Sequence, residues 1–384
     1  MSFEPKGIER DGWAPEVGVT RTRAELDLRR DPVMLRAIAE IAPGTQLRQG
    51  IDDIIRSKEG ALIVIGDPEE LSFLYSGGMK LDLPFAPQLL YELAKMDGAI
   101  IVNRDLTRLA YANVQLMPDP TIASSETGTR HRTAERVAKQ TDALVVSISQ
   151  QRETVTVFLG RRRYQLEPIT DVLAKTNQAL ATLETFRQRL DQVLTRLTAL
   201  EFQNAVVLDD VLVVLQRAEL TTRMAEEVER ACVELGSEGR MIRMQLEELV
   251  AEVPDEKAAV LLDYQASLAG RDAEQVVLGL ASLPYQSLLD VSVLAELLGY
   301  PPTIDPTDYS VTPRGYRILS HIPRLPPEII QKVVDDLDGL EAIVRASNRE
   351  LEAVVGVGPA RAREIREGLR RLQEHNLVDR YLQL

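Results

Sequence analysis

Two arginines flank a histidine directly after a Gly-Thr pair in the stretch GTRHRTAER, residues 128–136. An amphipathic run follows, with Ala134 and Val137 at helical spacing, so the arginines lie where a helix is predicted to begin. A helix start carries positive partial charge and disfavours cations unless an anion is bound there. Thr129 or Thr127 is expected to cap this helix, while its other first-turn amides stay open. The pattern therefore predicts an anion site.

Arg130 and Arg132 would add bidentate cationic donors to those amides and complete a cradle for a polyphosphate. The alternative is that both arginines form surface ion pairs with Glu126 and Glu135. Taken alone, the RHR sequence favours the phosphate cradle only slightly over the surface ion pairs.

A carboxylate stands in a second motif, KMDGAIIV, residues 95–102. Asp97 lies in a loop before an apolar run that predicts a buried strand, and Gly98 and Ala99 follow it. Glycine lets another group approach the backbone, and a carboxylate beside it is suited to hold a divalent cation against phosphates. The alternative is an ordinary Asp-Gly turn, which the motif alone favours.

The elements around these motifs predict an α/β fold for residues 31–168, a mixed sheet covered by helices. Besides the helix at the arginines, helices are expected at 32–41, 47–55 and 87–95, and strands at 61–66, 98–102, 109–116 and 143–149. Gly160 separates the stretches TVTVFL, residues 154–159, and RRRYQLE, residues 161–167, which predicts two strands in a closing hairpin. Residues 1–30, which are acidic and polar, are expected to form a flexible extension.

The middle region, 169–310, is predicted to be an all-α linker domain. No proline occurs between residues 170 and 234, and leucines recur there at helical spacing. That pattern favours a long helix or a helical hairpin. Pro284 and the pair Pro301–Pro302 then divide the remainder into shorter helices.

The tail, residues 311–384, is also predicted to be all-α. Gly356, Val357 and Gly358 form a glycine-flanked turn between two helical runs. Pro359 is suited to the first position of the second helix, because that position needs no amide hydrogen. Backbone amides at such a turn bind phosphate. Gly358 is expected to take a backbone conformation that a β-branched residue resists.

Positive charge gathers beside this turn. Between residues 361 and 371 five arginines, including Arg361 and Arg363, stand against two glutamates. The pattern resembles a helix–hairpin–helix DNA-binding element, and a stretch from His321 resembles a degenerate second copy. Such elements contact phosphate and sugar, so sequence-independent, salt-sensitive binding is expected. The alternative is an ordinary helical hairpin with a solvated face.

Composition narrows the classes of protein. The length of 384 residues suggests two or three domains, and the absence of about eighteen consecutive apolar residues predicts no transmembrane helix. One cysteine, Cys232, excludes an internal disulfide, and the spacing of His131, His321 and His375 does not favour a zinc site. A net charge of −14 argues against a surface that coats nucleic acid, but it allows a local basic face. A cytoplasmic location is expected.

Together these motifs resemble the signature of diadenylate cyclase domains. The matching residues are Asp97-Gly98-Ala99, Leu116 and GTRHRT at 128–133. The resemblance continues through ISQ at 148–150, NQALATLE at 177–184 and TPRGYR at 312–317, and it ends in the hairpin tail. Beyond the N-terminal extension, the whole chain resembles a bacterial diadenylate cyclase family that scans DNA integrity.

The resemblance implies that two ATP condense to cyclic di-AMP and two pyrophosphates. It implies that Asp97 binds the cofactor, Mg²⁺ or Mn²⁺, and acts in catalysis with Arg130, His131 and Arg132. The residues it assigns to ATP are Gly98, Ala99, Leu116, Gly128, Thr129, Arg130, His131, Arg132, Thr133 and Ser149. Those it assigns to DNA are Gly356, Val357, Gly358, Arg361 and Arg363.

The partners follow from the reaction and from the resemblance. Each chain has one Asp97 and one arginine pair, whereas the reaction needs two ATP, so two cyclase domains are expected to meet face to face. The resemblance implies a homo-octamer, a preference for branched DNA such as recombination junctions, and association with the nucleoid. No membrane partner is expected.

Two other functions are open at this point. One is a non-catalytic DNA-binding scaffold that senses ATP, although a pure sensor need not keep the carboxylate of Asp97. The other is a DNA repair nuclease, which would need clustered carboxylates for two metals. The sequence offers no such cluster near a basic stretch.

Overall fold

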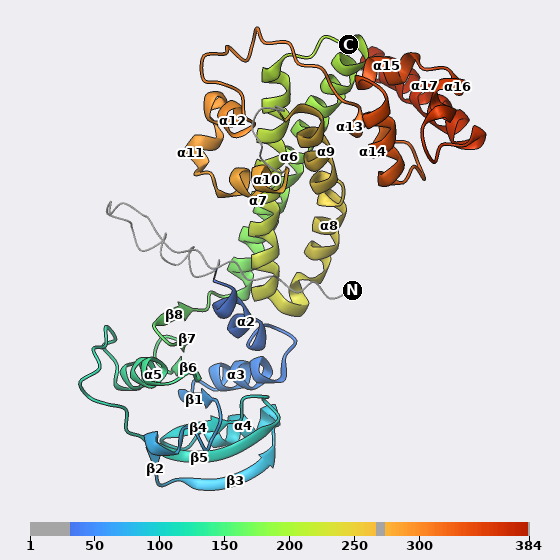
Figure 1. Ribbon diagram of the computed structural model, residues 1–384. Helices are drawn as coiled ribbons and strands as arrows, with labels where there is room; N and C mark the ends of the chain where they lie inside the picture. Colours follow the sequence, from blue (N-terminus) through green and yellow to red (C-terminus); the bar gives the residue numbers. More distant parts are fainter. Residues whose placement is uncertain (1–30, 266–272, 383–384) are drawn as a thin grey trace. The chain divides into compact units, whose positions relative to one another are not determined.

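The computed structural model describes residues 31–265 and 273–382, with side chains described over 31–265 and 275–374 (Figure 1). The extension expected over residues 1–30 lies outside this description, as does the side chain of His375. The chain divides into two compact units. One ends at Val172 and includes Val233–Glu238, and the other comprises Leu173–Cys232 and the residues from Gly239. None of the described helices is long and apolar enough to cross a membrane.

The strands of the first unit form one mixed sheet in the order β2-β5-β4-β1-β6-β7-β8, with β3 paired to β5. The strands are β1 (Ala61–Ile65), β2 (Tyr75–Ser76), β3 (Met79–Pro84), β4 (Ala99–Val102), β5 (Arg108–Leu116), β6 (Leu144–Ser149), β7 (Thr154–Leu159) and β8 (Arg162–Gln165). β1 and β4 are parallel, and the other paired strands described are antiparallel. The predicted mixed sheet and the hairpin around Gly160 are confirmed.

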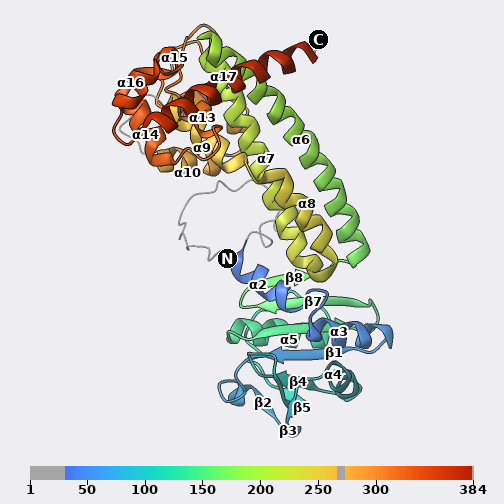
Figure 2. The same cartoon turned by 90° about the vertical axis from the view of Figure 1, so that its right-hand side faces the viewer.

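Helices cover both faces of this sheet, as Figures 1 and 2 show. The helices α2 (Pro32–Glu40), α3 (Gln46–Arg56) and α4 (Pro87–Ala94) share one apolar core with the sheet. The helix α5 (Thr129–Gln140) packs against the opposite face in a second core. Residues of β1 enter these two cores alternately: Ile63 lies in the first, and Leu62 and Val64 lie in the second. Burial on both faces explains why this strand is apolar throughout.

The sequence pattern does not predict β2 and β3. They form the outer row along β5, and most of β3 is exposed, so no apolar periodicity marks it. Gly77 and Gly78 separate them with φ of +65° and +78°, and a Cβ on Gly78 would lie 2.5 Å from the Val114 side chain. The Gly-Gly pair therefore marks a kink where the backbone passes close to β5.

In the second unit, α6 (Ile169–Gln203) and α7 (Leu208–Leu235) form the predicted helical hairpin. Leu190 and Leu197 of α6 share a buried core with Val211 and Leu215 of α7. The helices that follow are α8 (Arg240–Val250), α9 (Val253–Tyr264), α10 (Ala273–Ser282), α11 (Tyr285–Leu288) and α12 (Val291–Leu297). Short 3₁₀ helices occupy Gly236–Gly239, directly before α8, and Ser72–Leu74 in the first unit. The helical character predicted for the middle region is confirmed.

The C-terminal helices α13 (Tyr316–Ser320), α14 (Pro327–Asp336), α15 (Gly339–Arg345), α16 (Asn348–Ala353) and α17 (Pro359–Leu382) enclose a further core. Two turns in this group have the same backbone hydrogen bonds. Between α16 and α17 the amides of Val354, Val357 and Ala362 donate to the carbonyl oxygens of Leu351, Val354 and Gly358, in that order. Between α13 and α14 the amides of Ile322, Leu325 and Ile330 donate to the carbonyl oxygens of Leu319, Ile322 and Pro326, in the same order. The two helix pairs are therefore repeats in structure.

Each repeat contains one residue with positive φ at the same place in its turn. Gly356 has φ +95°, and a Cβ there would meet the Ile329 side chain at 3.1 Å. In the first repeat Arg324 takes φ +65° at the equivalent place. Gly358 does not have positive φ and has open space around it, so the prediction that Gly358 needs a special conformation is wrong. The requirement belongs to Gly356.

A buried ionic cluster joins α6, α9 and α13. Arg317 is 1 % exposed, and its guanidinium forms an ion pair with the buried carboxylate of Glu201 and donates to Thr198 Oγ1 at 2.6 Å. The Tyr264 hydroxyl donates to the same carboxylate at 2.8 Å. Asp263 accepts bonds from the amides of residues 315–317 at 2.7 to 2.9 Å and so caps α13.

Because both charges are buried, Arg317→Met should lower the free energy of unfolding by about 3–5 kcal/mol, since it leaves Glu201 unpaired in the interior. Urea unfolding followed by far-UV circular dichroism measures this loss. The double variant Arg317→Met/Glu201→Gln should recover much of it, because Glu201 is then uncharged and Glu256, the other carboxylate paired with Arg317, keeps its pair with His321. If the free energy of unfolding of the single variant lay within about 1 kcal/mol of the wild-type value, water would be shown to reach and solvate the cluster.

Candidate functional site

The strand pairing brings the sequence motifs to one edge of the sheet. β1 and β4 are parallel, with Ile63 opposite Ile100, so Gly60 before β1 and the loop with Asp97 before β4 lie at the same edge of the sheet. β6 is antiparallel to β1, with Ala61 opposite Ile148, so Ser149 lies opposite Gly60. Asp97, Gly60 and Ser149 therefore lie at the ends of three neighbouring strands, and we call this edge the row.

The row extends to Leu116 at the end of β5. Val114 pairs with Ala99, so Leu116 lies near Asp97 on the side away from Gly60. Its side chain is half-buried and packs against the core on the α5 face. A planar apolar group could therefore rest on Leu116 while its polar end points along the row.

Arg130 connects the first turn of α5 to this row. Its Nη1 donates to the carbonyl oxygen of Ile148 at 3.4 Å. A Cβ placed on Gly60 would lie 2.0 Å from the same nitrogen, so the guanidinium occupies the space that this glycine leaves. The sequence interpretation did not single out Gly60, whose role depends on a helix about seventy residues further along the chain.

The start of α5 is open. Its N-cap is Gly128, with φ −84° and ψ 144°, and no side chain caps the helix. The predicted cap from Thr129 or Thr127 is therefore wrong. The first amide to reach an intrahelical acceptor is that of Arg132, which donates to Gly128 at 2.8 Å. Earlier amides of the turn point out of the helix end and are available to an anion.

The two glutamates proposed as partners of the arginines are engaged elsewhere. Glu126 forms an ion pair with Arg163 of β8, and Glu135 forms one with Lys139 at 2.7 Å. Within the described part of the chain, the Arg132 side chain donates only to the backbone oxygen of Glu126, at 3.3 Å. Among the described residues, neither Arg130 nor Arg132 pairs with a carboxylate. Their positive charge is thus available to a ligand.

His131 lies half-buried between this helix start and β7, with its ring edge-on to Phe158 at 6.5 Å between centroids. Burial lowers the pKa of the imidazole, Glu126 opposes the shift, and Arg163, Arg130 and Arg152 add to it. The ring is therefore neutral near pH 7. It can donate one hydrogen bond without repelling the arginines around it.

The same contacts reveal two cations that the sequence interpretation missed, Arg152 and Arg163. Arg152 follows β6, and its amide donates to Ser149 Oγ at 3.3 Å. Arg163 belongs to the RRR run that was assigned only to a strand. The run of like charge was the available signal, but the sequence does not show which face it occupies.

Asp97 is exposed, and its carboxylate makes no hydrogen bond or ion pair with another described residue. Gly98 has φ +107°, and a Cβ there would lie 2.9 Å from both the carbonyl carbon and Oδ1 of Asn113. A bulge of β5 therefore requires glycine at this position whether or not a ligand is bound. Ala99 begins β4 and is buried. Thr129 is exposed and Thr133 is half-buried on the first turns of α5.

In the second unit, the turn before α17 brings the tail residues together. Val357, Ala362 and Ile365 are buried in the C-terminal core, as expected for a turn that packs on its own helices. Gly358 is exposed, and Arg361 donates from Nη1 to the Gly356 oxygen at 2.7 Å. Arg363 is exposed two residues further along the helix.

Two family models match consecutive regions of the chain. Residues 48–162 match the family model described as the DisA bacterial checkpoint controller nucleotide-binding region, and residues 166–306 match the DisA bacterial checkpoint controller linker region. The chain is 22% identical to the crystal structure of a double mutant of DacA from Staphylococcus aureus, over 38% of this chain and 90% of that chain, with a TM-score of 0.26.

Several curated relatives match nearly full length. The DNA integrity scanning protein DisA of Carboxydothermus hydrogenoformans is 48% identical over 90% of this chain and 98% of its own length. Those of Acetivibrio thermocellus and Kineococcus radiotolerans are 45% and 46% identical, each over 92% of this chain and 98% of theirs. On this extent of identity, and with both regions matched in order, the chain belongs to the family of the DNA integrity scanning protein DisA.

Proposed function

We propose that this protein is a diadenylate cyclase that condenses two ATP into cyclic di-AMP and two pyrophosphates. The observation that carries the proposal is the row at the sheet edge, where the loop with Asp97, the Arg130 side chain and the end of β6 at Ser149 lie at the same edge as an open helix start. An anionic ligand with a cation-binding end fits this arrangement. Family membership supports it, because the matched region is described as nucleotide-binding.

Different residues of the site would bind different parts of ATP. The amides of the α5 start, Arg130 and Arg132 would bind the phosphates, with the neutral His131 and the hydroxyls of Thr129, Thr133 and Ser149 as further donors. Leu116 would pack against the base. Gly128, Gly98 and Ala99 shape the backbone beside the ligand. The arginines would also neutralise charge that develops at the α-phosphate, where phosphoryl transfer depends on positioning and electrostatics.

Asp97 is suited to Mg²⁺ or Mn²⁺, because its carboxylate is a hard oxygen donor without a protein partner among the described residues. The described residues hold no group of three or more potential ligands, so a cation here would share its coordination with substrate phosphates and water. When bound, such an ion polarises the α-phosphate and acidifies the attacking hydroxyl. Asp97 would position it at the row.

Two copies of the chain are needed for the reaction. Each 3′-hydroxyl would attack the α-phosphate of the other ATP, while one chain supplies only one Asp97 and one arginine cradle. We therefore propose that two cyclase domains face each other. We further propose that such pairs form part of an octamer, as the family resemblance implies. The most direct test is to incubate the purified protein with ATP and Mg²⁺ or Mn²⁺ and to detect cyclic di-AMP by mass spectrometry.

We also propose that the tail from Val311 is a helix–hairpin–helix domain that binds DNA through its backbone, prefers branched molecules and associates with the nucleoid. The two equivalent turns and the exposed arginines beside the second one support this. The name of the relatives points the same way. Binding through phosphate would be independent of sequence and would weaken with salt.

Asp97→Asn should abolish cyclic di-AMP synthesis, because it removes the charge that positions the cation and changes almost no volume. ATP should still bind through the arginine cradle, as measured by isothermal titration. Asp105→Asn, an exposed carboxylate after the other end of β4, is the matched control and should retain activity. Near-normal turnover of Asp97→Asn would remove this residue from the site.

Arg132→Ala should raise the Kd for ATP about tenfold or more and slow turnover as well, since a hydrogen bond to a charged group contributes about 1.5–3 kcal/mol. Both effects are expected because a phosphate donor acts in the bound substrate and in the transition state. Arg104→Ala, at the opposite edge of the sheet, should change neither constant. Unchanged ATP affinity in Arg132→Ala would contradict the cradle.

Gly356→Val should remove DNA binding and leave cyclic di-AMP synthesis intact, because a β-branched residue at φ +95° distorts the turn and meets Ile329. Gly358→Ala is the useful comparison, because its Cβ would meet no protein atom. Weaker DNA binding by Gly358→Ala would therefore report on the approach of a phosphate to the turn. Full DNA affinity in Gly356→Val, measured by fluorescence anisotropy, would contradict the assignment of the turn.

A further inference from the structure

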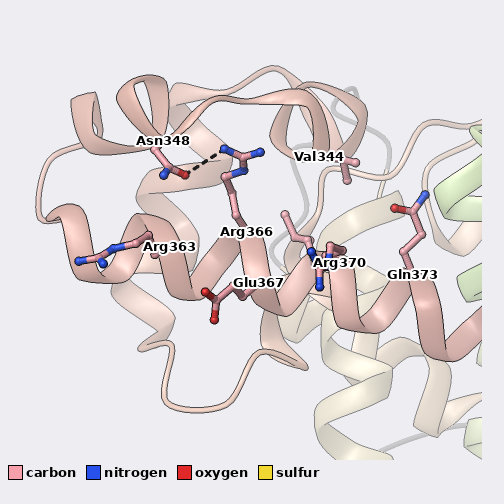
Figure 3. Close-up of a pocket in the computed structure, with 8 residues that line it drawn as sticks. Val344, Asn348, Arg363, Arg366, Glu367, Arg370 and Gln373 are labelled. Carbon is pink, nitrogen blue, oxygen red and sulfur yellow. Dashed lines mark hydrogen bonds between the residues drawn. The ribbon is translucent and has the colours of Figure 1, made fainter.

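α17 carries a second basic surface beyond the turn at Gly356, shown in Figure 3. A groove of about 400 Å³ opens between α17 and the pair α15–α16. Its lining residues are Val344, Asn348, Arg363, Arg366, Glu367, Leu369, Arg370 and Gln373. We call it the α17 groove. Among its arginines only Arg363 was assigned to DNA above, so Arg366 and Arg370 have no role in the proposed function.

The charge of these two arginines is not neutralised inside the groove. Arg366 donates from Nη1 to Asn348 Oδ1 at 3.2 Å, and this neutral acceptor orients the guanidinium while leaving its charge. Arg370 pairs with Glu374 at 3.1 Å, but the two side chains are 77 % and 61 % exposed, so this pair is weak and exchangeable. Glu367 also lines the groove, but among the described residues no ion pair joins its carboxylate to an arginine.

The shape and spacing of the groove suit a phosphodiester chain. Arg363 and Arg370 lie on one side of α17, and they are about 10 Å apart along the helix axis at 1.5 Å per residue. A duplex lying parallel to this row would present about three phosphates of each strand over that length, since each strand carries one phosphate per about 3.4 Å of duplex axis. Val344 and Leu369 give the groove an apolar part, against which the sugar faces of a backbone can pack. Arginine forks match the phosphate oxygens.

We infer that the α17 groove is a second binding site for DNA backbone, and that it takes a different duplex arm from the one at the Gly356 turn. The amides of that turn point out of the N-terminal end of α17, whereas the groove opens along the side of the helix. Arg370 lies about 17 Å along the axis from the N-terminal end of α17, at 1.5 Å per residue, whereas Arg363 lies near that end. A stiff, straight duplex placed beyond the end of α17 therefore does not also run along the groove to Arg370. A branched molecule supplies two arms. This inference rests on the proposed DNA binding of the tail.

An acidic protein segment would also satisfy the arginines. The length of the arginine row and its position on the helix that follows the turn favour DNA. The protein alternative predicts that changes in the groove leave binding of every DNA unchanged, so the same experiment separates the two.

The test compares the full-length variant Arg366→Gln/Arg370→Gln with Arg349→Gln/Arg371→Gln. Both pairs remove two positive charges from exposed positions of the C-terminal helices, but Arg349 and Arg371 do not line the groove. A labelled four-way junction and a linear duplex of one arm are titrated at several salt concentrations. Equal melting temperatures and equal cyclic di-AMP synthesis without DNA establish that both variants are folded.

The groove variant should bind the junction roughly tenfold more weakly and lower the salt slope by about 2, one for each lost phosphate contact. It should bind the linear duplex like the wild type, and the control variant should resemble the wild type on both. Unchanged junction binding, equal losses on both DNAs, or an equal loss in the control would overturn the inference. Failure of the wild type to bind either DNA would instead refute the proposed DNA function of the tail.

Discussion

The parallel pairing of β1 with β4 is the constraint on which the candidate nucleotide site depends. It sets the residues before both strands at one edge, and the antiparallel β6 returns its end to the same place. A slip of one residue would turn every side chain of a strand to the other face. The two cores oppose such a slip, because each side chain of β1 is packed in one of them and would have to repack in the other. Asp97 and Ser149 are thus held in position by apolar residues that touch no ligand.

Two glycines at this edge of the sheet leave space that neighbouring groups of the protein occupy. Gly60 leaves space for the guanidinium of Arg130, and Gly98 leaves space for Asn113 of the bulged β5. In both cases the close contact comes from the protein itself. The edge is therefore organised before any ligand arrives, which lowers the entropy lost when phosphates and a cation are bound. Figure 1 shows the elements that meet there, β4, β1, β6 and α5.

Much of this arrangement could be predicted from the sequence, and the failures have physical causes. The buried strands and the helices that cover them were found because apolar runs and periodicity are local signals. β3 was missed because an exposed outer strand needs no apolar pattern. The cap of α5 and the special glycine of the tail were assigned wrongly, because residue type does not reveal φ. Arg152 and Arg163 were missed because their relation to His131 arises only when β6, β7 and β8 pair.

The distribution of charge links the two basic regions to their proposed ligands. The chain carries a net charge of −14, so most of its surface repels polyanions. Against that background, the open start of α5 and the arginines of α17 are places where an anion is attracted rather than repelled. In the first unit the carboxylates near the arginines are already paired with other cations, as Glu126 is with Arg163. In the second, Arg366 is held by a neutral amide. In both regions neighbouring groups orient the arginines but leave their charge available, and this separates a binding surface from a solvated row of charges.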